Sequence, residues 1–391
     1  MSPSYQLPDL LSLSRPFELR TNQSCRTVTQ ASEAWLFALK GSELDNTLTR
    51  AELASLSSMK AGLLAALCFP GCDPPQLRFL TDFLTFLILS DQRVRHAKQL
   101  PDSGWSEGDV GDKNGFDLLN NHALFQYIIP QMKRLISRAP LDWDTRFTSS
   151  VVSYHSAQLQ AISNRSNNIV PELEEYMKLR RDLSGLNMIF DLVELTEIAA
   201  FTVPDTNLSE KMETLKRLAA DIISCSLDVV SFNADQAQGN PHNLITVLVT
   251  HKALSLQGAF TFAGALIKDM YGAFAAIEES LLDLGQPTPP QPNHSRLLTL
   301  FSPAWTWSPF PSASTPTSPT IPEQLKQQVD STLSDLHSCV QALKDCVVGT
   351  VNWVYETELY FGKKGEEIRT FGWVFLNPKT DERELTVTPI P

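Results

Sequence analysis

Residues Leu208–Ala237 read LSEKMETLKRLAADIISCSLDVVSFNADQA. Apolar side chains return every three or four positions through this stretch, which is the spacing of one face of an α-helix. Neither glycine nor proline interrupts it. The stretch therefore predicts one long helix.

The same periodicity extends over most of the chain. Further helices are predicted at Glu52–Phe69, Gln76–Lys98, Phe116–Ser137, Phe147–Ile162, Val170–Ile198, Asn243–Leu284 and Glu323–Tyr360. Alternating strand patterns are nearly absent; only Gly365–Leu376 and Arg383–Thr388 could form a short hairpin or an extended tail. No repeat with a period of 20 to 50 residues is present, which argues against a solenoid. The sequence predicts an all-α protein.

A proline-rich segment interrupts the helices. Ten of the 25 prolines fall between Pro287 and Pro322, together with Trp305 and Trp307. The segment could link two domains, but the helix after it carries features that pair with earlier ones. We therefore expect a single domain over residues 1–391, with residues 286–322 as an insertion within it.

The composition argues against a nucleic-acid-binding, membrane-spanning or secreted protein. The formal net charge is −12 and no run of Lys and Arg reaches four residues, so a nucleic-acid duplex or an anionic membrane is an unexpected partner. We expect no membrane span, because no apolar run approaches 18 residues, and no signal peptide at Met1–Leu13. The six cysteines form no CxxC pair, which fits reduced thiols in a cytoplasmic protein.

Two carboxylates and a hydroxyl share one stripe of the long helix. Asp228, Ser231 and Asp235 are spaced i, i+3 and i+7, so they face the same side. An all-oxygen stripe suits Mg²⁺, which prefers hard oxygen ligands. The alternative interpretation is a solvated helix face.

Three other stretches carry candidate functional groups. Asp91 ends an apolar helical run that contains Phe83, Phe86 and Leu87, so a carboxylate lies at the rim of an apolar face. Arg180 and Arg181 precede a Ser184-Gly185 pair, where a kink would let a guanidinium reach a phosphate. For Asp91 the alternative is a helix that simply leaves the core at this point. For Arg180 and Arg181 it is an ordinary surface arginine on a bent helix. The third stretch, 352–365, contains Trp353 and Tyr360 and, taken alone, is typical of the aromatic end of a core helix.

Taken in order, these stretches resemble the fungal class I terpene cyclases. In that family an aspartate-rich DDxxD-type motif near position 90, an arginine on a kinked helix, an N(D)xxSxxxE motif about 46 positions later and a late W…RY element surround one cavity. Here Leu227 stands 46 positions after Arg181, at the start of the second motif. The likeness covers roughly residues 35–375 without the insertion, and it implies a class I terpenoid synthase helical bundle around a central cavity.

The resemblance implies a role for each matching residue. Asp91 would bind Mg²⁺ from one wall of the cavity and Ser231 and Asp235 from the other. Asp228 would replace the lost asparagine of the motif, either as a metal ligand or as a hydrogen-bond acceptor behind the ligands. Arg181 would sense the diphosphate, Ser184 and Gly185 would form the kink, and Tyr360 would lie beside the diphosphate. The substrate's hydrocarbon would contact the cavity lining, which we expect to be Trp353, Phe83, Phe86 and Leu87.

The chain also departs from the family pattern. Gln92 and Arg95 occupy the next two acidic positions of the first motif, Leu227 and Asp235 replace the Asn and Glu of the second, and Leu359 replaces the late Arg. Two interpretations of Arg95 stay open: it pairs with Asp91 and weakens its metal affinity, or it holds a diphosphate oxygen and replaces part of the metal cluster. We favour the second.

The resemblance implies a sesquiterpene cyclase of secondary metabolite biosynthesis, a carbon–oxygen lyase. It would ionise farnesyl diphosphate with Mg²⁺, close a ring by a humulene-type 1,11-closure and lose a proton to give a cyclic hydrocarbon. A divalent cation would explain how an acidic protein binds a polyanion. The alternative is a non-catalytic helical binding protein derived from such a cyclase. The resemblance also implies that two copies could pair as a homodimer.

Overall fold

The computed structural model describes residues 4–38, 48–97, 100–105, 115–137, 139–197, 206–282 and 323–378. Within these ranges the chain is helical apart from one two-stranded sheet, as the periodicity predicts. The α-helices are α1 (Leu10–Ser14), α2 (Cys25–Ala38), α3 (Arg50–Met59), α4 (Ala61–Cys68), α5 (Pro74–His96), α6 (Gly115–Asn121), α7 (Ile129–Ile136), α8 (Leu141–Ser166), α9 (Leu173–Leu183), α10 (Leu186–Glu197), α11 (Thr206–Ala237), α12 (Leu244–Lys252), α13 (Leu256–Leu282), α14 (Glu323–Glu356), α15 (Glu358–Phe361) and α16 (Gly365–Phe371). Short 3₁₀ turns lie at Leu100–Ser103, Phe125–Tyr127 and Gly362–Lys364.

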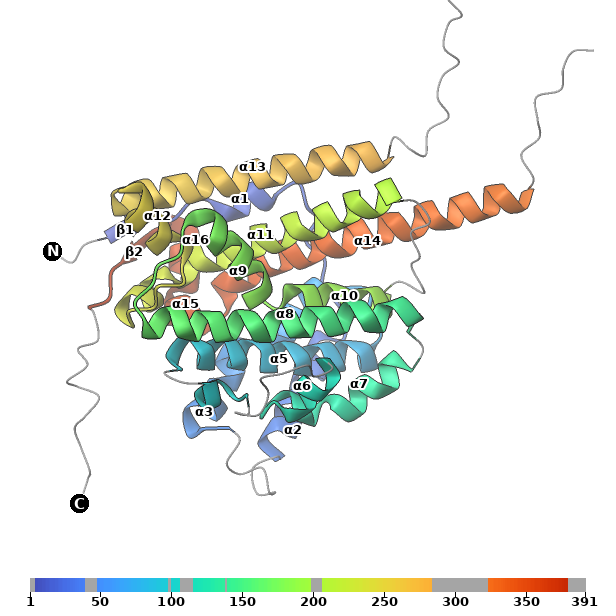
Figure 1. Cartoon of the computed structure of the whole chain (residues 1–391), viewed down its shortest axis with the longest axis horizontal. Coiled ribbons are helices and arrows are strands. Elements are labelled where there is room, and N and C mark those ends of the chain that lie inside the picture. The colour runs from blue at the N-terminus through green and yellow to red at the C-terminus, as the bar shows by residue number, and fades with distance from the viewer. Residues whose placement is uncertain are drawn as a thin grey trace, which may run out of the picture.

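The long predicted helix, α11, lies at the centre of the packing. It contacts α13 and α14 along its length and also touches α9 and α12 (Figure 1). On the other side of the molecule α8 lies against α5, and α4 packs between α5 and α14. Helices from distant parts of the sequence thus pack together into one bundle.

Helix α5 has clear start and stop signals. Pro74 and Pro75 occupy its first turn, where no intrahelical donor is needed, and the amide of Asp73 donates to Gln76 at 3.2 Å. Three basic residues, Arg93, Arg95 and His96, occupy its last turn, where a positive charge is favourable to the helix dipole. Arg95 is thereby presented at the end of an otherwise apolar helix.

Several helices predicted as continuous are broken. Phe116–Ser137 forms α6, a 3₁₀ turn and α7, and Glu323–Tyr360 forms α14 and α15. Two other breaks occur at residues with a left-handed backbone. Glu52–Phe69 is divided at Lys60 (φ 51°) and Asn243–Leu284 at Ala253 (φ 49°). Periodicity continues across both breaks, so the pattern did not reveal them. At the first break the indole Nε1 of Trp353 donates to the carbonyls of Met59 and Lys60, at 3.0 and 3.1 Å. The Lys60 carbonyl also accepts from the amides of Leu63 and Leu64 at the start of α4, so the indole of Trp353 ties this break to α14.

The two ends of the described chain meet in the sheet. Strand β1 (Ser4–Gln6) pairs antiparallel with β2 (Trp373–Phe375), with Tyr5 opposite Val374. The prediction of a hairpin or extended tail over Gly365–Leu376 is therefore wrong in its first half, which forms α16. Residues 383–388 lie outside the described residues, as does the insertion at 286–322.

One hydrophobic cluster runs through the described helices, from Tyr5 to Val374. Among these helices, α13 has the length and apolar composition of a membrane span. Only 28% of its most apolar stretch is buried inside the molecule, with Phe260, Ile267 and Phe274 fully buried.

Candidate active site

Two connected compartments open beside the ends of α5 and α11. The outer one has a volume of about 540 Å³ and is lined mainly by polar side chains, whereas the inner one, about 100 Å³, is largely apolar. The inner compartment is lined by Leu64, Phe69, Leu84, Leu87, Ile189, Ile223, Leu227 and Trp353, among others. Both compartments share Ile88, Asp91, Arg95 and Tyr360, which form the junction. An anionic group could lie outside this junction and an apolar chain inside it.

Arg95 joins the two walls of the junction. Its Nε donates to Oδ2 of Asp91 at 2.7 Å, and its Nη1 donates to Oδ1 of Asp235 on α11 at 2.5 Å. Burial alone lowers the pKa of the guanidinium, but the charges of Asp235 and Asp91 outweigh burial and hold it well above its ordinary value. The guanidinium thus stays charged between the two carboxylates that were expected to bind a metal from opposite walls.

The carboxylate of Asp235 is saturated by protein donors. Its Oδ1 accepts from Arg95 and from Asn240 Nδ2 at 2.8 Å, and its Oδ2 accepts from Ser231 Oγ at 2.7 Å and from Asn243 Nδ2 at 2.9 Å. Burial raises the pKa of Asp235, but the charge of Arg95 and these hydrogen bonds outweigh it and hold the pKa below its ordinary value. A carboxylate offers about four acceptor positions, and here each is in use.

Asn240 and Asn243 were missed by the sequence interpretation. Asn243 is the N-cap of α12, where its Oδ1 accepts from the Ile245 amide at 2.9 Å. An asparagine directly before an apolar helical run is a recognisable start signal, but its second bond to Asp235 is tertiary. Asn240 follows α11 in a turn and carried no sequence signal.

Asp228 does not line either compartment, which corrects its expected role as a metal ligand. It is fully buried and accepts from Tyr176 Oη, from Arg180 Nε at 3.0 Å and from the Leu244 amide at 3.1 Å. Burial raises the pKa of its carboxyl group, against the opposing charge of Arg180. It faces α9 and the start of α12, because the helix turns it away from the junction.

The arginine that reaches the cavity is Arg180 and not Arg181. Arg181 forms an ion pair with Asp221, at 2.6 and 3.0 Å, and lines neither compartment. Arg180 is buried and lines the inner compartment. The signal for this was present: Tyr176 and Arg180 are four residues apart on the buried face of α9.

The predicted kink separates α9 from α10. Ser184 lines the inner compartment, and its hydroxyl donates to the Arg181 carbonyl at 2.6 Å. Gly185 has φ +68°, and a Cβ built there would lie 2.6 Å from Cδ1 of Leu87. Glycine is therefore required both by the backbone and by the close approach of α5.

The aromatic residues near the carboxyl end lie at the cavity. Trp353 lines the inner compartment and meets Tyr360 edge-on, with ring centroids 6.0 Å apart. Burial raises the pKa of Tyr360, so its hydroxyl keeps its proton. Leu359, which stands where the family has an arginine, lines the outer compartment.

Phe83 and Phe86 are placed differently from the prediction. Both are buried but face Phe125, with ring centroids 5.2 and 6.4 Å away, and neither lines a described compartment. Leu87, one residue further along α5, does line the inner one. The periodicity places all three on apolar positions but does not say which apolar face borders the cavity.

The donor set does not fit a metal ion shared between the two walls. Asp235 has no acceptor position left, and Ser231 is bonded to Asp235. Over the ranges that the structure describes, no group of three or more His, Cys, Asp and Glu side chains could hold a metal. On the Asp91 wall, Oδ1 receives no hydrogen bond from a described residue, so one carboxylate oxygen is available there.

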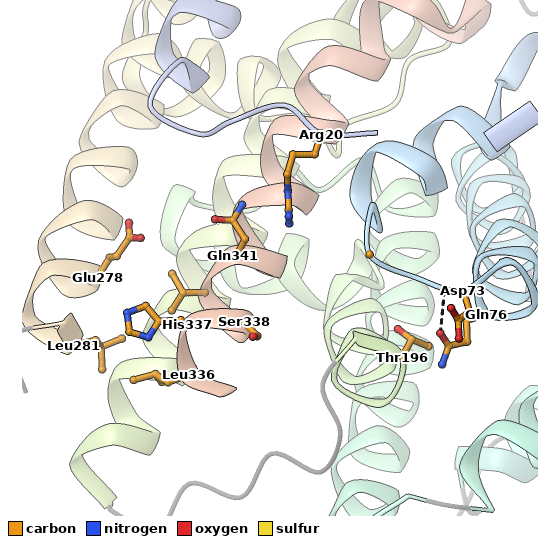
Figure 2. Close-up of a pocket in the computed structure, with 12 residues that line it drawn as sticks. Arg20, Asp73, Gln76, Thr196, Glu278, Leu281, Leu336, His337, Ser338 and Gln341 are labelled. Carbon is orange, nitrogen blue, oxygen red and sulfur yellow. Dashed lines mark hydrogen bonds between the residues drawn. The ribbon is translucent and has the colours of Figure 1, made fainter. Parts of the chain in front are cut away.

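A third pocket, of about 580 Å³, lies between the first turns of α5 and the facing parts of α13 and α14 (Figure 2). Among its charged groups, Arg20 pairs with Asp345 and Glu278 with Lys344 at 2.9 Å, while the side chain of Asp73 caps α5. It contains none of the predicted site residues.

Comparison with known proteins agrees with the family resemblance of the sequence. The family model for terpene synthase family 2, C-terminal metal binding, matches residues 111–272. The sesquiterpene synthase Agr1 of Cyclocybe aegerita is 27% identical over 382 residues, covering 95% of this chain and 93% of the relative. An alpha-muurolene synthase of Coprinopsis cinerea is 26% identical and covers 99% of this chain and 79% of the relative.

Solved structures show the same fold. Germacradien-4-ol synthase from Streptomyces citricolor superposes with a TM-score of 0.63 at 15% identity, covering 87% of this chain and 96% of that one. An α-eudesmol synthase superposes at 0.59 and 17% identity, covering 87% and 97%. The chain therefore has the all-helical fold of the class I terpene synthases, and over most of its length it is similar to fungal sesquiterpene synthases.

Proposed function

We propose that this chain converts farnesyl diphosphate to a cyclic sesquiterpene hydrocarbon. The observation that carries the proposal is the junction, where a polar outer compartment meets an apolar inner one at Asp91, Arg95 and Tyr360. The diphosphate would lie outside the junction and the fifteen-carbon chain inside it, which requires the inner compartment, about 100 Å³ without substrate, to widen on binding. The relatives named above as sesquiterpene synthases support this substrate class.

In the proposed reaction the allylic carbon–oxygen bond breaks and diphosphate leaves with the electron pair. The cation closes a ring, by the humulene-type 1,11-closure that the family resemblance suggests, and then loses a proton. Arg95, Arg180 and the hydroxyl of Tyr360 are the donors of this chain that border the junction. Donors fixed where charge develops stabilise the departing anion without reorganising.

The inner compartment would protect the cation from water. Its lining is aliphatic and aromatic, and Trp353 presents an indole whose Nε1 is already bonded to backbone carbonyls. An aromatic face stabilises a nearby cation by ~0.5–2 kcal/mol. Excluding water keeps the cation from being quenched before the ring closes.

The negative charge of the outer compartment suggests how Mg²⁺ would take part in diphosphate binding. Two guanidinium groups and four carboxylates line it, a formal charge of 2 − 4 = −2, from Arg93, Arg95, Glu52, Asp91, Asp102 and Asp235. A bare diphosphate would be repelled by this excess of negative charge. Since the walls do not fit a shared metal, we propose that Mg²⁺ enters as the counter-ion of the diphosphate.

The experiment is incubation of the purified protein with geranyl, farnesyl and geranylgeranyl diphosphate, with Mg²⁺ or EDTA, and analysis of the volatiles by gas chromatography and mass spectrometry. A cyclic C15 hydrocarbon from farnesyl diphosphate supports the proposal. Absence of product from all three substrates, with protein shown to be folded, rejects it.

A second candidate is a non-catalytic helical binding protein with the same fold. The saturated carboxylate of Asp235 favours it, because one expected metal wall is closed by protein donors. This candidate predicts that farnesyl diphosphate binds and is recovered unchanged.

A further inference from the structure

We propose that the Arg95 guanidinium is the resident cation of this site: it fills the place between Asp91 and Asp235, so the protein takes no divalent ion there. The inference rests on the proposed function only for the role of the site in diphosphate binding. Its corollary is that removing the guanidinium converts the two walls into a divalent-cation site.

The geometry supports the replacement of a divalent metal ion by the Arg95 guanidinium. Asp91 on α5 and Asp235 on α11 each turn one oxygen toward the same guanidinium, at 2.7 and 2.5 Å. Nothing else among the described residues joins these two carboxylates. The cation that neutralises Asp91 and Asp235 is therefore a side chain of the protein, the Arg95 guanidinium.

Burial makes this cation important for the stability of the folded protein. The side chain of Asp235 is only 1% exposed and that of Arg95 18%. An ionised carboxylate buried without a cationic partner is strongly destabilising. Asn240, Asn243 and Ser231 would still donate to Asp235 after loss of Arg95, but they bring no charge.

Loss of Arg95 would also free the ligand atoms. Oδ1 of Asp235 would lose one of its two donors, and Oδ2 of Asp91 its 2.7 Å partner, so each wall would offer an oxygen to the same space. The formal charge of the outer compartment would change from −2 to −3. Oxygen ligands and a higher negative charge are what Mg²⁺ prefers.

One nitrogen of the guanidinium remains for a ligand. Nε and Nη1 are used by the two carboxylates, whereas no described residue accepts from Nη2. Because Arg95 lines both compartments, this nitrogen can serve a diphosphate oxygen without breaking the bridge. The two interpretations of Arg95 from the sequence are thus compatible: it pairs with Asp91 and it can contact the diphosphate.

The test measures thermal unfolding and calorimetric Mg²⁺ binding for the full chain without substrate. Wild type, Arg95→Ala and Arg93→Ala are compared in EDTA and in millimolar Mg²⁺. Arg93 is the matched control, because it lies in the same last turn of α5, lines the same outer compartment and pairs with Glu52 at 2.6 Å. It does not join Asp91 to Asp235.

We expect the wild-type midpoint to be the same in both conditions and no Mg²⁺ binding by calorimetry. Arg95→Ala should unfold roughly 5 °C lower in EDTA and recover at least half of that loss in Mg²⁺. Arg93→Ala should lose stability without recovery. Mg²⁺ binding by the wild type, or no recovery by Arg95→Ala, would overturn the inference.

A second variant keeps the test decisive. If Arg95→Ala does not fold, Arg95→Gln replaces it, since the amide keeps one hydrogen bond and removes the charge. Because no substrate is present, the result is independent of turnover. If the wild-type protein makes no terpene but Mg²⁺ restores the stability of Arg95→Ala, only the proposed function is rejected. If the wild-type protein makes a terpene but Mg²⁺ does not restore the stability of Arg95→Ala, only the inference about Arg95 is rejected.

Discussion

Arg95 and Asp235 are 140 residues apart in the sequence, and a 2.5 Å contact between Nη1 and Oδ1 joins them at the junction of the two compartments. The contact ties the end of α5 to the end of α11. The family pattern places metal-binding carboxylates on these two helices, whereas this chain places a guanidinium between them.

Arg180 and Arg181 should differ sharply in their effect on stability. Arg180→Ala leaves the fully buried Asp228 without its cation and should lower the free energy of unfolding by about 3–5 kcal/mol. Arg181→Ala breaks a more exposed pair with Asp221 and should cost about 1 kcal/mol. Urea denaturation of both variants measures the difference. Equal losses would contradict the assignment of Arg180 to the cavity.

Gly185 should not tolerate a side chain. Gly185→Ala adds a Cβ 2.6 Å from Leu87 at φ +68° and should cost about 2–4 kcal/mol. Gly239 is the matched control, since its φ is +69° but a Cβ there meets nothing within 4 Å. Gly239→Ala should cost about 1 kcal/mol, from backbone strain alone. Denaturation curves that show the same loss for both variants would exclude a role for the contact with Leu87.

His242 should make the protein less stable in mild acid. Burial, together with the charge of Arg165, lowers its pKa to about 4, whereas an unfolded histidine titrates near ~6.5. As the pH falls below ~6.5, the unfolded chain binds a proton that the folded chain does not bind until about pH 4. The folded state therefore loses about 2 kcal/mol between pH 7 and pH 5 through this group.

The measurement compares wild type with His242→Gln by denaturant unfolding at several pH values. The variant lacks this group, so the difference between the two free energies of unfolding should change by about 2 kcal/mol over the interval. The neighbouring contact, Asn164 Nδ2 at 3.3 Å from Nε2, suits a neutral imidazole. Parallel curves for the two proteins would show that His242 is protonated equally in both states.

Leu359→Arg should strengthen diphosphate binding. The new guanidinium would enter the outer compartment and reduce its formal negative charge by one. A charge-assisted bond to phosphate should raise the affinity for inorganic diphosphate about tenfold in calorimetry with Mg²⁺. Leu359→Gln is the control of similar size without charge. An equal gain for both variants would mean that charge is not the cause.

The sequence alone predicted the helical architecture, the long α11 and the kink at Ser184-Gly185. These features depend on local periodicity and on the backbone freedom of glycine, both of which are visible in the residues themselves. The breaks at Lys60 and Ala253 were missed, because nothing in lysine or alanine favours a left-handed conformation. They are stabilised by tertiary contacts, such as the bonds from Trp353 to the carbonyls of Met59 and Lys60.

The sequence predicted which residues lie at the site more accurately than it predicted what each of them does. Asp91, Arg95, Ser231 and Asp235 do line one compartment, whereas Asp228 and Arg181 face away from it. One residue along a helix turns a side chain by about 100°, so neighbours on a spacing pattern can point to different surroundings. Whether a carboxylate is free to bind metal depends on its tertiary donors, and the sequence showed neither Asn240 nor the reach of Arg95.

The place of the Arg95 guanidinium can be tested by a crystal structure of the wild-type protein grown with Mn²⁺, which scatters anomalously and replaces Mg²⁺. If Arg95 is the resident cation, its guanidinium lies between Asp91 and Asp235, with no anomalous peak between them. A peak about 2.0–2.2 Å from oxygens of both carboxylates, with Arg95 displaced, would contradict it.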